Sequence, residues 1–353
     1  MKLALLQAGK VLGKTKKNPA VGCVIVKNNC LVSAGHTGIN GIPHAEYNAI
    51  KFGKTKTEKS DLYVTLEPCS NYGKTPPCTK LIIKNKLRKV FFSINDPDSR
   101  SFNKSHLTFK KNGVKLSKAI LNNEIKSFYR SYIKSKTKDL PFVTSKFAIS
   151  KDFFSINKKE KWITNKFSRG RVHLLRSMHD CLLTTSSTVN NDNPDLTCRI
   201  SGLKKYSPAR IILDKNLKAN KNSKIFKQAK KYKTIIFHNK NDNKKIKFLE
   251  RFGVKFIKIP IDINKNLNLR YCLEKIKKLG YSRVFLEAGI RLTTIFLKDN
   301  LVDDFFLFIS KNKIKSDGDG SFEKIIKNLL KKKKNTIEKV FLFGDKLISF
   351  KIK

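Results

Sequence analysis

Two kinds of hydrophobic pattern alternate along the first 139 residues. Short apolar runs rich in β-branched and aromatic residues predict strands, whereas longer stretches with apolar residues at helical spacing predict helices. The predicted strands are residues 23–26, 31–36, 62–66 and 90–94, with a hairpin turn at 28–29 between the first two. The predicted helices are residues 3–12, 43–50, 78–86 and 104–112, and Pro43 fits the start of the second, which puts His44 and Glu46 in its first turn. This order predicts an α/β sheet with helices on both faces, a three-layer α/β/α domain.

A second set of strands and helices follows a lysine-rich, helix-like stretch at 122–138. Leu140-Pro141 marks the predicted boundary, which divides the chain into domains 1–139 and 140–353. The predicted strands of the second domain are residues 142–149, 181–185, 209–213, 234–237, 254–259 and 283–286, followed by closing antiparallel strands at 305–310, 340–343 and 347–352. The predicted helices are residues 166–178, 244–252, 269–279 and 293–298. Strands that alternate with helices predict a second α/β domain.

The composition is strongly basic, with a formal net charge of +49 on 353 residues. Such a charge is typical of proteins that bind nucleic acid or another polyanion. However, the lysines are spread over the whole chain and accompany many Asn, Ile and Phe residues, which A/T-rich codons also favour. We therefore expect codon bias rather than a nucleic-acid partner, and a field that helps to attract phosphorylated small molecules. The run 331–334 reads as a solvated helix end or loop.

The cysteines and the apolar runs indicate the cellular compartment in which the protein is expected. Seven cysteines at irregular spacing do not form a disulfide framework. The N-terminal residues lack the long apolar stretch of a signal peptide, and no run reaches the length of a transmembrane helix. We expect a soluble, cytoplasmic protein without a membrane partner, and leave open whether it forms a homo-oligomer.

The strongest chemical signal lies between residues 43 and 78. It consists of Pro43-His44-Ala45-Glu46, then Pro68-Cys69, then Cys78 after eight intervening residues. One imidazole and two thiolates suffice to hold a catalytic zinc, and Glu46 is then free to transfer protons. Buried cysteines often serve only as small apolar residues. That alternative does not explain why Cys69 and Cys78 flank a Pro/Gly-rich loop instead of lying within apolar runs.

With this motif in place, the whole chain resembles the bifunctional deaminase/reductase family of riboflavin biosynthesis. The most specific segment is residues 63–78, Tyr-Val-Thr-Leu-Glu-Pro-Cys-Ser-Asn-Tyr-Gly-Lys-Thr-Pro-Pro-Cys. Its long Cys-to-Cys spacing distinguishes it from cytidine, cytosine and tRNA-adenosine deaminases, which use P-C-x-x-C. Four blocks in the second half resemble reductase signatures: Trp162-Ile163-Thr164, 184–189, 192–197 and Glu287-Ala288-Gly289.

The resemblance implies a cytidine-deaminase-like three-layer domain at 1–139 and a dihydrofolate-reductase-like α/β domain at 140–353. It implies hydrolytic deamination of 2,5-diamino-6-ribosylamino-4(3H)-pyrimidinone 5′-phosphate, which requires one Zn²⁺. It then implies reduction of the ribosyl group to ribityl by NADPH. The second domain has no G-x-G-x-x-G, which disfavours a Rossmann fold.

The resemblance also implies roles for individual residues. In the first domain His44, Cys69 and Cys78 would hold zinc, Glu46 would transfer protons, and Asn18 and Lys74 would contact the base and the phosphate. The matching cofactor positions are Ala148, Trp162, Thr188, Asp192, Lys215 and the loop formed by Gly289, Ile290, Arg291, Leu292, Thr293, Thr294 and Ile295. The matching substrate positions are Glu160, Arg176, Leu196, Arg199 and Glu287.

Several of these positions have simpler readings. Lys74 could also be a solvated lysine, and Gly289 fits a plain strand-to-helix turn. Arg176 fits a helix-surface residue, and Trp162, as the only tryptophan, would by default be a core residue.

Some segments of the second domain depart from the family pattern. Phe153 replaces a glycine that would allow a tight turn, and Ile290-Arg291 replaces Gly-Pro. Lys215 stands where a small polar residue is common. These departures motivate an alternative in which the chain is a deaminase with a decayed reductase domain. A second alternative, a basic RNA-binding or RNA-editing protein, is disfavoured by the spacing of Cys69 and Cys78.

Overall fold

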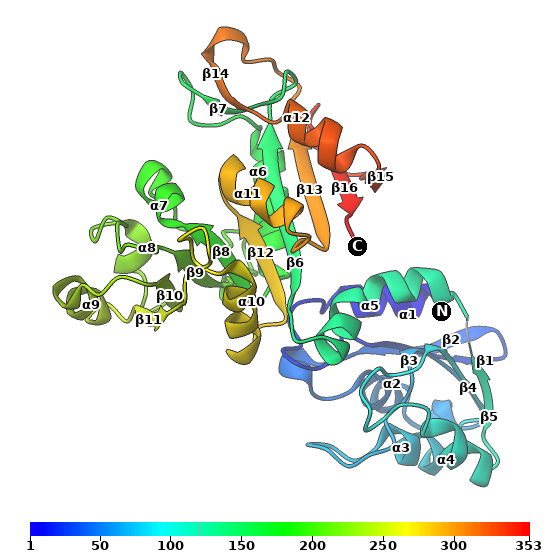
Figure 1. Cartoon of the computed structure of the whole chain (residues 1–353). Coiled ribbons are helices and arrows are strands. Elements are labelled where there is room, and N and C mark those ends of the chain that lie inside the picture. The colour runs from blue at the N-terminus through cyan, green and yellow to red at the C-terminus, as the bar shows by residue number, and fades with distance from the viewer. Residues whose placement is uncertain (119) are drawn as a thin grey trace. The chain divides into compact units, whose positions relative to one another are not determined.

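The computed structural model describes residues 1–118 and 120–353, which form two compact units, Met1–Asp139 and Leu140–Lys353. Figure 1 traces the elements of each unit along the chain. Both units are α/β, as the hydrophobic pattern predicts. Within the described residues, none of the helices combines the length and the apolar character that crossing a membrane requires.

The first unit contains a five-stranded sheet in the order β2-β1-β3-β4-β5. Its strands are β1 (Gly22–Lys27), β2 (Cys30–His36), β3 (Asp61–Leu66), β4 (Lys89–Ile94) and β5 (Lys115–Lys118). Its α-helices are α1 (Lys2–Gly9), α2 (Ala45–Gly53), α3 (Cys78–Lys84), α4 (Ser105–Lys111) and α5 (Asn122–Thr137). β1 is antiparallel to β2 and β3, whereas β3, β4 and β5 are parallel. Helices cover both faces of this sheet, with α1 and α5 on one side and α2, α3 and α4 on the other (Figure 1).

Two glycines allow helices to approach this sheet closely. A Cβ atom on Gly22 would lie 1.8 Å from the carbonyl oxygen of Ala4 in α1. A Cβ atom on Gly35 would lie 2.6 Å from the carbonyl oxygen of Ala45 in α2. Because Gly35 has no side chain, α2 can lie directly against β2. This contact positions His44, which immediately precedes the first residue of α2.

Two predictions for the first unit are corrected. Pro43 lies outside α2, which begins at Ala45 with His44 as its N-cap residue in extended conformation. β5 has no counterpart among the predicted strands. It is a short edge strand whose sequence, Lys-Leu-Ser-Lys, contains a single apolar residue and therefore carries almost no strand signal.

The second unit contains a nine-stranded sheet in the order β11-β10-β9-β8-β12-β6-β13-β16-β15. Its strands are β6 (Phe142–Ile149), β8 (Cys181–Thr185), β9 (Ala209–Leu213), β10 (Thr234–His238), β11 (Lys255–Lys258), β12 (Arg283–Glu287), β13 (Asp304–Ile309), β15 (Lys334–Ile337) and β16 (Lys346–Lys351). A separate pair is formed by β7 (Phe154–Asn157) and β14 (Gly318–Ser321). The α-helices are α6 (Lys166–Ser177), α7 (Ser186–Asp192), α8 (Lys224–Lys227), α9 (Asn243–Glu250), α10 (Leu269–Lys278), α11 (Ile290–Lys298) and α12 (Glu323–Ile325).

Hydrophobic layers lie on both faces of this sheet. Along β9, Ile211 packs in one core cluster with residues of α10 and α11, whereas Ile212 packs in a second cluster with residues of α6, α8 and α9. Ile235 and Ile236 of β10 divide in the same way. Strands that are buried on both faces read as continuous apolar runs, which is why the central parallel strands were predictable.

Two predictions for the second unit are corrected, and several of its elements were not predicted. Residues 340–343 form no strand, and β15, which does pair with β16, has all four residues exposed and lacks an alternating pattern. The β7–β14 pair was not predicted. Neither was α7, whose Ser/Thr/Asn-rich sequence has low helix propensity. The helix expected at 293–298 begins three residues earlier, so residues 290–292, expected in a loop, belong to α11.

Candidate active site and metal centre

Three separate elements bring His44, Cys69 and Cys78 together. His44 precedes α2, Cys69 follows the end of β3 by three residues, and Cys78 is the first residue of α3. Nδ1 of His44 lies 3.3 Å from Sγ of Cys78 and 3.5 Å from Sγ of Cys69. The backbone N–H of Cys78 donates to Sγ of Cys69 at 3.3 Å. The ligand atoms of all three residues lie within 4.8 Å of one another.

These distances fit a zinc ion. Tetrahedral zinc, with Zn–S bonds of about 2.3 Å and Zn–N bonds of about 2.0–2.1 Å, holds a nitrogen and a sulfur ligand about 3.6 Å apart. The two separations between His44 Nδ1 and the thiol sulfurs come close to this value. One nitrogen and two sulfur ligands leave a fourth coordination position, which is typical of catalytic zinc.

Glu46 lies in the first turn of α2, beside this cluster. It is buried, with only 4% of the residue exposed, and burial raises the pKa of its carboxyl group to about 7. Hydrogen bonding from Cys78, followed by that from His44, lowers the pKa of the Cys69 thiol to about 4. The cluster thus combines a stabilised thiolate with a buried carboxyl group suited to proton transfer.

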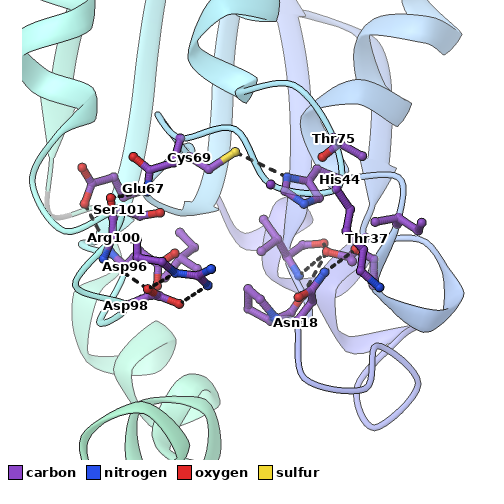
Figure 2. A pocket seen from close by; sticks show the side chains of 18 of the residues that line it. Asn18, Thr37, His44, Glu67, Cys69, Thr75, Asp96, Asp98, Arg100 and Ser101 are labelled. Atoms are coloured by element: carbon purple, nitrogen blue, oxygen red, sulfur yellow. Dashed lines mark hydrogen bonds and ion pairs between the residues drawn. The ribbon is translucent and has the colours of Figure 1, made fainter.

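A cavity of about 300 Å³ opens onto the cluster. Figure 2 shows His44 and Cys69 near its centre, with Asn18 and Thr37 on one side. Asn18 donates from its side-chain amide to the carbonyl oxygen of Gly41 at 2.8 Å, which fixes its orientation. Lys74 is exposed and lines the same cavity. The structure therefore brings all six predicted residues of the first domain to one metal cluster and its cavity.

The other side of the cavity is formed by residues that sequence reasoning missed. They are Glu67, Asp96, Asp98, Arg100, Ser101, Tyr132 and Lys136. The carboxylate of Glu67 accepts hydrogen bonds from the backbone N–H groups of Asp96, Asn103 and Ser105, which shapes the loop after β4. The strand pattern could have indicated these residues. β4 is parallel to β3, and the residues that follow adjacent parallel strands lie at the same edge of a sheet, so the loop after β4 lies near Cys69, which follows β3.

In the second unit, Arg176 and Glu287 bind each other. Nε of Arg176 donates to Oε1 of Glu287 at 2.6 Å and a terminal nitrogen donates to Oε2 at 2.8 Å. Both side chains are only 11% exposed, so the helix-surface reading of Arg176 is wrong. Lys146, which the sequence did not single out, is the register partner of Glu287 on the adjacent strand β6. Burial lowers the pKa of Lys146.

The expected cofactor positions lie on several elements. Ala148 is in β6, Thr188 and Asp192 are in α7, and Gly289 is the N-cap residue of α11. The side chain of Thr185 accepts from the backbone N–H of Thr188 at 3.2 Å and so caps α7. Lys215 lies just after β9, where its Nζ donates to the carbonyl oxygen of Lys265 at 2.7 Å.

The predicted substrate and cofactor residues Glu160, Trp162 and Arg199 lie at the surface of this unit, and so do the cofactor positions Asp192, Gly289 and Arg291. Trp162 is 52% exposed, with the guanidinium carbon of Arg169 4.8 Å from its ring centroid, so the core reading of Trp162 is wrong. Arg199 donates to Asp195 at 3.2 Å, whereas Leu196 is buried in left-handed conformation, with φ of 53°. A terminal nitrogen of Arg176 donates to the backbone carbonyl oxygen of Thr197 at 3.1 Å, which joins the ion pair to the segment that carries Leu196 and Arg199.

Comparison with known proteins decides the family. Residues 1–94 match the cytidine and deoxycytidylate deaminase zinc-binding region, and residues 141–311 match the RibD C-terminal domain. The riboflavin biosynthesis protein RibD of Aquifex aeolicus is 33% identical over 99% of this chain and 96% of its own. The chain belongs to the RibD family. RibD of Chlamydia muridarum is 31% identical over 97% of this chain and 92% of its own.

Solved RibD structures share the fold. A deaminase/reductase from Thermotoga maritima is 29% identical and covers 99% of this chain and 97% of its own, with a TM-score of 0.84. RibD of Acinetobacter baumannii is 25% identical over the same shares of the two chains, also with a TM-score of 0.84. The predicted deaminase-like and dihydrofolate-reductase-like folds are confirmed. As a RibD family member, the chain is a bifunctional enzyme of riboflavin biosynthesis, with a zinc-dependent deaminase and an NADPH-dependent reductase.

Proposed function

We propose that residues 1–139 deaminate 2,5-diamino-6-ribosylamino-4(3H)-pyrimidinone 5′-phosphate and that residues 140–353 reduce its ribosyl group to ribityl. The product is 5-amino-6-ribitylamino-uracil 5′-phosphate. The convergence of His44, Cys69 and Cys78 beside the buried Glu46 carries this proposal. The match of the second unit to the RibD C-terminal domain supports the reductase half.

In the deaminase half, His44, Cys69 and Cys78 would hold the zinc ion. The bound ion supplies Lewis acidity that brings the pKa of a water molecule to about 7. Glu46 would accept a proton from the attacking water and would deliver a proton to the leaving amino group, which would depart as ammonia. Asn18, oriented by Gly41, binds the base, and Lys74 binds the phosphate.

In the reductase half, the cofactor positions near the ends of β6 and β9 and on α7 and α11 would hold NADPH, which supplies a hydride. Gly289 begins α11, whose unpaired N-terminal amides favour a phosphate group. Glu160, Arg176, Leu196, Arg199 and Glu287 form the proposed substrate positions. Arg176 keeps Glu287 charged and fixes the orientation of its carboxylate.

The proposal extends to partners and location. The proposed ligands are small phosphorylated pyrimidines rather than nucleic acid, despite the net charge. Their binding is compatible with either a monomeric or a homo-oligomeric protein. Zinc held by thiolates suits the reducing cytoplasm. Absence of salt-sensitive tRNA binding at physiological ionic strength would support this assignment.

A stepwise assay tests both halves. Zinc-loaded protein should release ammonia from the diaminopyrimidine phosphate in the absence of NADPH. Addition of NADPH should then lead to its oxidation in proportion to the deaminated product. Bound zinc without ammonia release would overturn the deaminase assignment. Ammonia release without NADPH oxidation would favour a decayed reductase domain.

A further inference from the structure

Asp98 binds two cationic side chains at the edge of the deaminase cavity. Arg100 donates from Nε to Oδ1 of Asp98 at 2.9 Å and from a terminal nitrogen to Oδ2 at 2.7 Å. Lys136, from α5, donates from Nζ to Oδ2 at 2.8 Å. All three residues line the cavity, and Figure 2 shows Asp98 and Arg100 across it from Asn18. The carboxylate therefore binds two cations that line the cavity, of which the Lys136 side chain is 26% exposed and the Arg100 side chain 76% exposed.

The loop that carries Lys74 is connected to this cluster. The side-chain amide of Asn71 donates to the backbone carbonyl oxygen of Arg100. Asn71 and Lys74 belong to the segment between the two cysteines, whereas Arg100 belongs to the loop after β4. This hydrogen bond joins the two loops, so Lys74, Arg100 and Lys136 contribute to the lining of one cavity.

The charges of these side chains fit a phosphate monoester. Lys74, Arg100 and Lys136 bring three positive charges to the lining of this cavity, and Asp98 forms ion pairs with Arg100 and Lys136. A phosphate monoester carries about −1.5 to −2 charges near neutral pH and offers three acceptor oxygens. Arginine has five N–H donors and lysine three, so bonding to Asp98 leaves each cation with donors for a ligand.

The other carboxylates at this side of the cavity are already occupied. Oδ1 of Asp96 accepts from the hydroxyl of Tyr132 at 3.0 Å and from the backbone N–H of Asp98 at 3.0 Å. Both oxygens of Glu67 accept hydrogen bonds from the loop after β4.

Arg100 and Lys136 lie after the residues that match the general zinc-binding region of deaminases. The match to the general zinc-binding region ends at residue 94, so it includes the metal cluster and Glu46 but neither of these cations. Residues that bind zinc and transfer protons serve every substrate of such enzymes. Residues added around the same cavity are placed to distinguish one substrate from another.

We propose that Arg100 and Lys136, positioned by Asp98, bind the phosphate group of the deaminase substrate together with Lys74 and select phosphorylated over unphosphorylated pyrimidine ribosides. This inference rests on the proposed deaminase function. It assigns to the loop after β4 and to α5 a specificity role distinct from that of the metal cluster.

The test compares two substrates in ammonia release, the diaminopyrimidine riboside phosphate and the same compound after removal of its phosphate. Arg100→Gln and Lys136→Gln should each lower kcat/KM for the phosphorylated compound about tenfold, mainly through KM, as expected for loss of a charge-assisted hydrogen bond. The unphosphorylated compound should change less than about twofold with the same variants. Inorganic phosphate should inhibit both variants more weakly than the parent enzyme.

Two further variants complete the design. Arg88→Gln removes a comparable bidentate Arg–Asp pair, that with Asp61, away from the cavity and should alter neither substrate's kinetics. Arg100→Lys keeps the charge and should retain most of the preference for phosphate. Zinc content and circular dichroism verify that each variant is folded.

Equal losses on both substrates, or no loss on the phosphorylated one, would overturn this inference while leaving the deaminase function intact. A zinc-loaded parent enzyme that releases no ammonia from either compound would instead overturn the proposed function, and this inference with it.

Discussion

The predicted site residues of the two units differ in how the fold arranges them. In the first unit the residues expected to hold zinc converge within 4.8 Å, and Glu46, Asn18 and Lys74 line the cavity beside them. In the second unit, Arg176 and Glu287 form a buried ion pair, whereas Glu160, Trp162 and Arg199 lie at the surface.

The difference reflects the number of elements that each site needs. The proposed zinc ligands come from the ends of three elements within 35 residues of sequence, and zinc–ligand bond lengths require them to lie close together. The reductase residues are spread from β6 to α11, on both sides of the central strands. A metal site therefore produces a short motif with defined spacing, whereas the residues that bind two extended ligands are scattered along the sequence and form no such motif.

The largest expected effect separates the two units chemically. Glu46→Gln should reduce ammonia release about a thousandfold, because proton transfer to the leaving amine is lost. Zinc content and NADPH oxidation with the deaminated substrate should remain unchanged. A variant that loses both activities together would show that the two sites do not act independently.

Loss of a metal ligand should be nearly as severe. Cys78→Ala should abolish stoichiometric zinc binding, measured by metal analysis, and with it deamination. Cys30→Ala is the matched control, because Cys30 is exposed and lies away from the cluster. Full zinc content in the Cys78 variant would contradict the ligand assignment.

A stability measurement probes the second unit. Glu287→Gln should lower the free energy of unfolding of the reductase unit by about 3 kcal/mol, because the buried guanidinium of Arg176 loses its charged partner. Arg199→Gln breaks an exposed ion pair with Asp195 and should change the free energy of unfolding by less than about 1 kcal/mol. Denaturant unfolding of both variants measures the contrast, and equal changes would contradict it.

The smallest effect is expected at the turn between β6 and β7. Phe153 has φ of +70°, in the left-handed region that costs a non-glycine residue about 1–2 kcal/mol. Its ring also packs against the core of the second unit. Phe153→Gly removes both the strain and the packing, so we expect a net change in unfolding free energy below about 1 kcal/mol.

NADPH oxidation by the Phe153→Gly variant should equal that of the parent enzyme. A large increase would instead show that this phenylalanine impairs the reductase, in favour of a decayed domain.

Much of the fold was predictable from hydrophobic patterning. Strands that are buried on both faces, such as β8, β9 and β10, have continuous apolar runs that the sequence displays directly. The missed strands β5 and β15 lie at sheet edges, where exposed residues need not be apolar. Their pairing with a neighbouring strand, rather than their own composition, makes them strands.

The sequence by itself predicted the proposed zinc ligand set, the proposed role of Glu46 and the α/β class of both units. These follow from residue type, local spacing and periodicity, all of which are properties of the chain within a short range. Only the tertiary structure decided that Asp98, Arg100 and Lys136 share the deaminase cavity and that Arg176 is bound by Glu287. The physical reason is that such contacts join residues distant in sequence through strand order and helix packing, which no local pattern records.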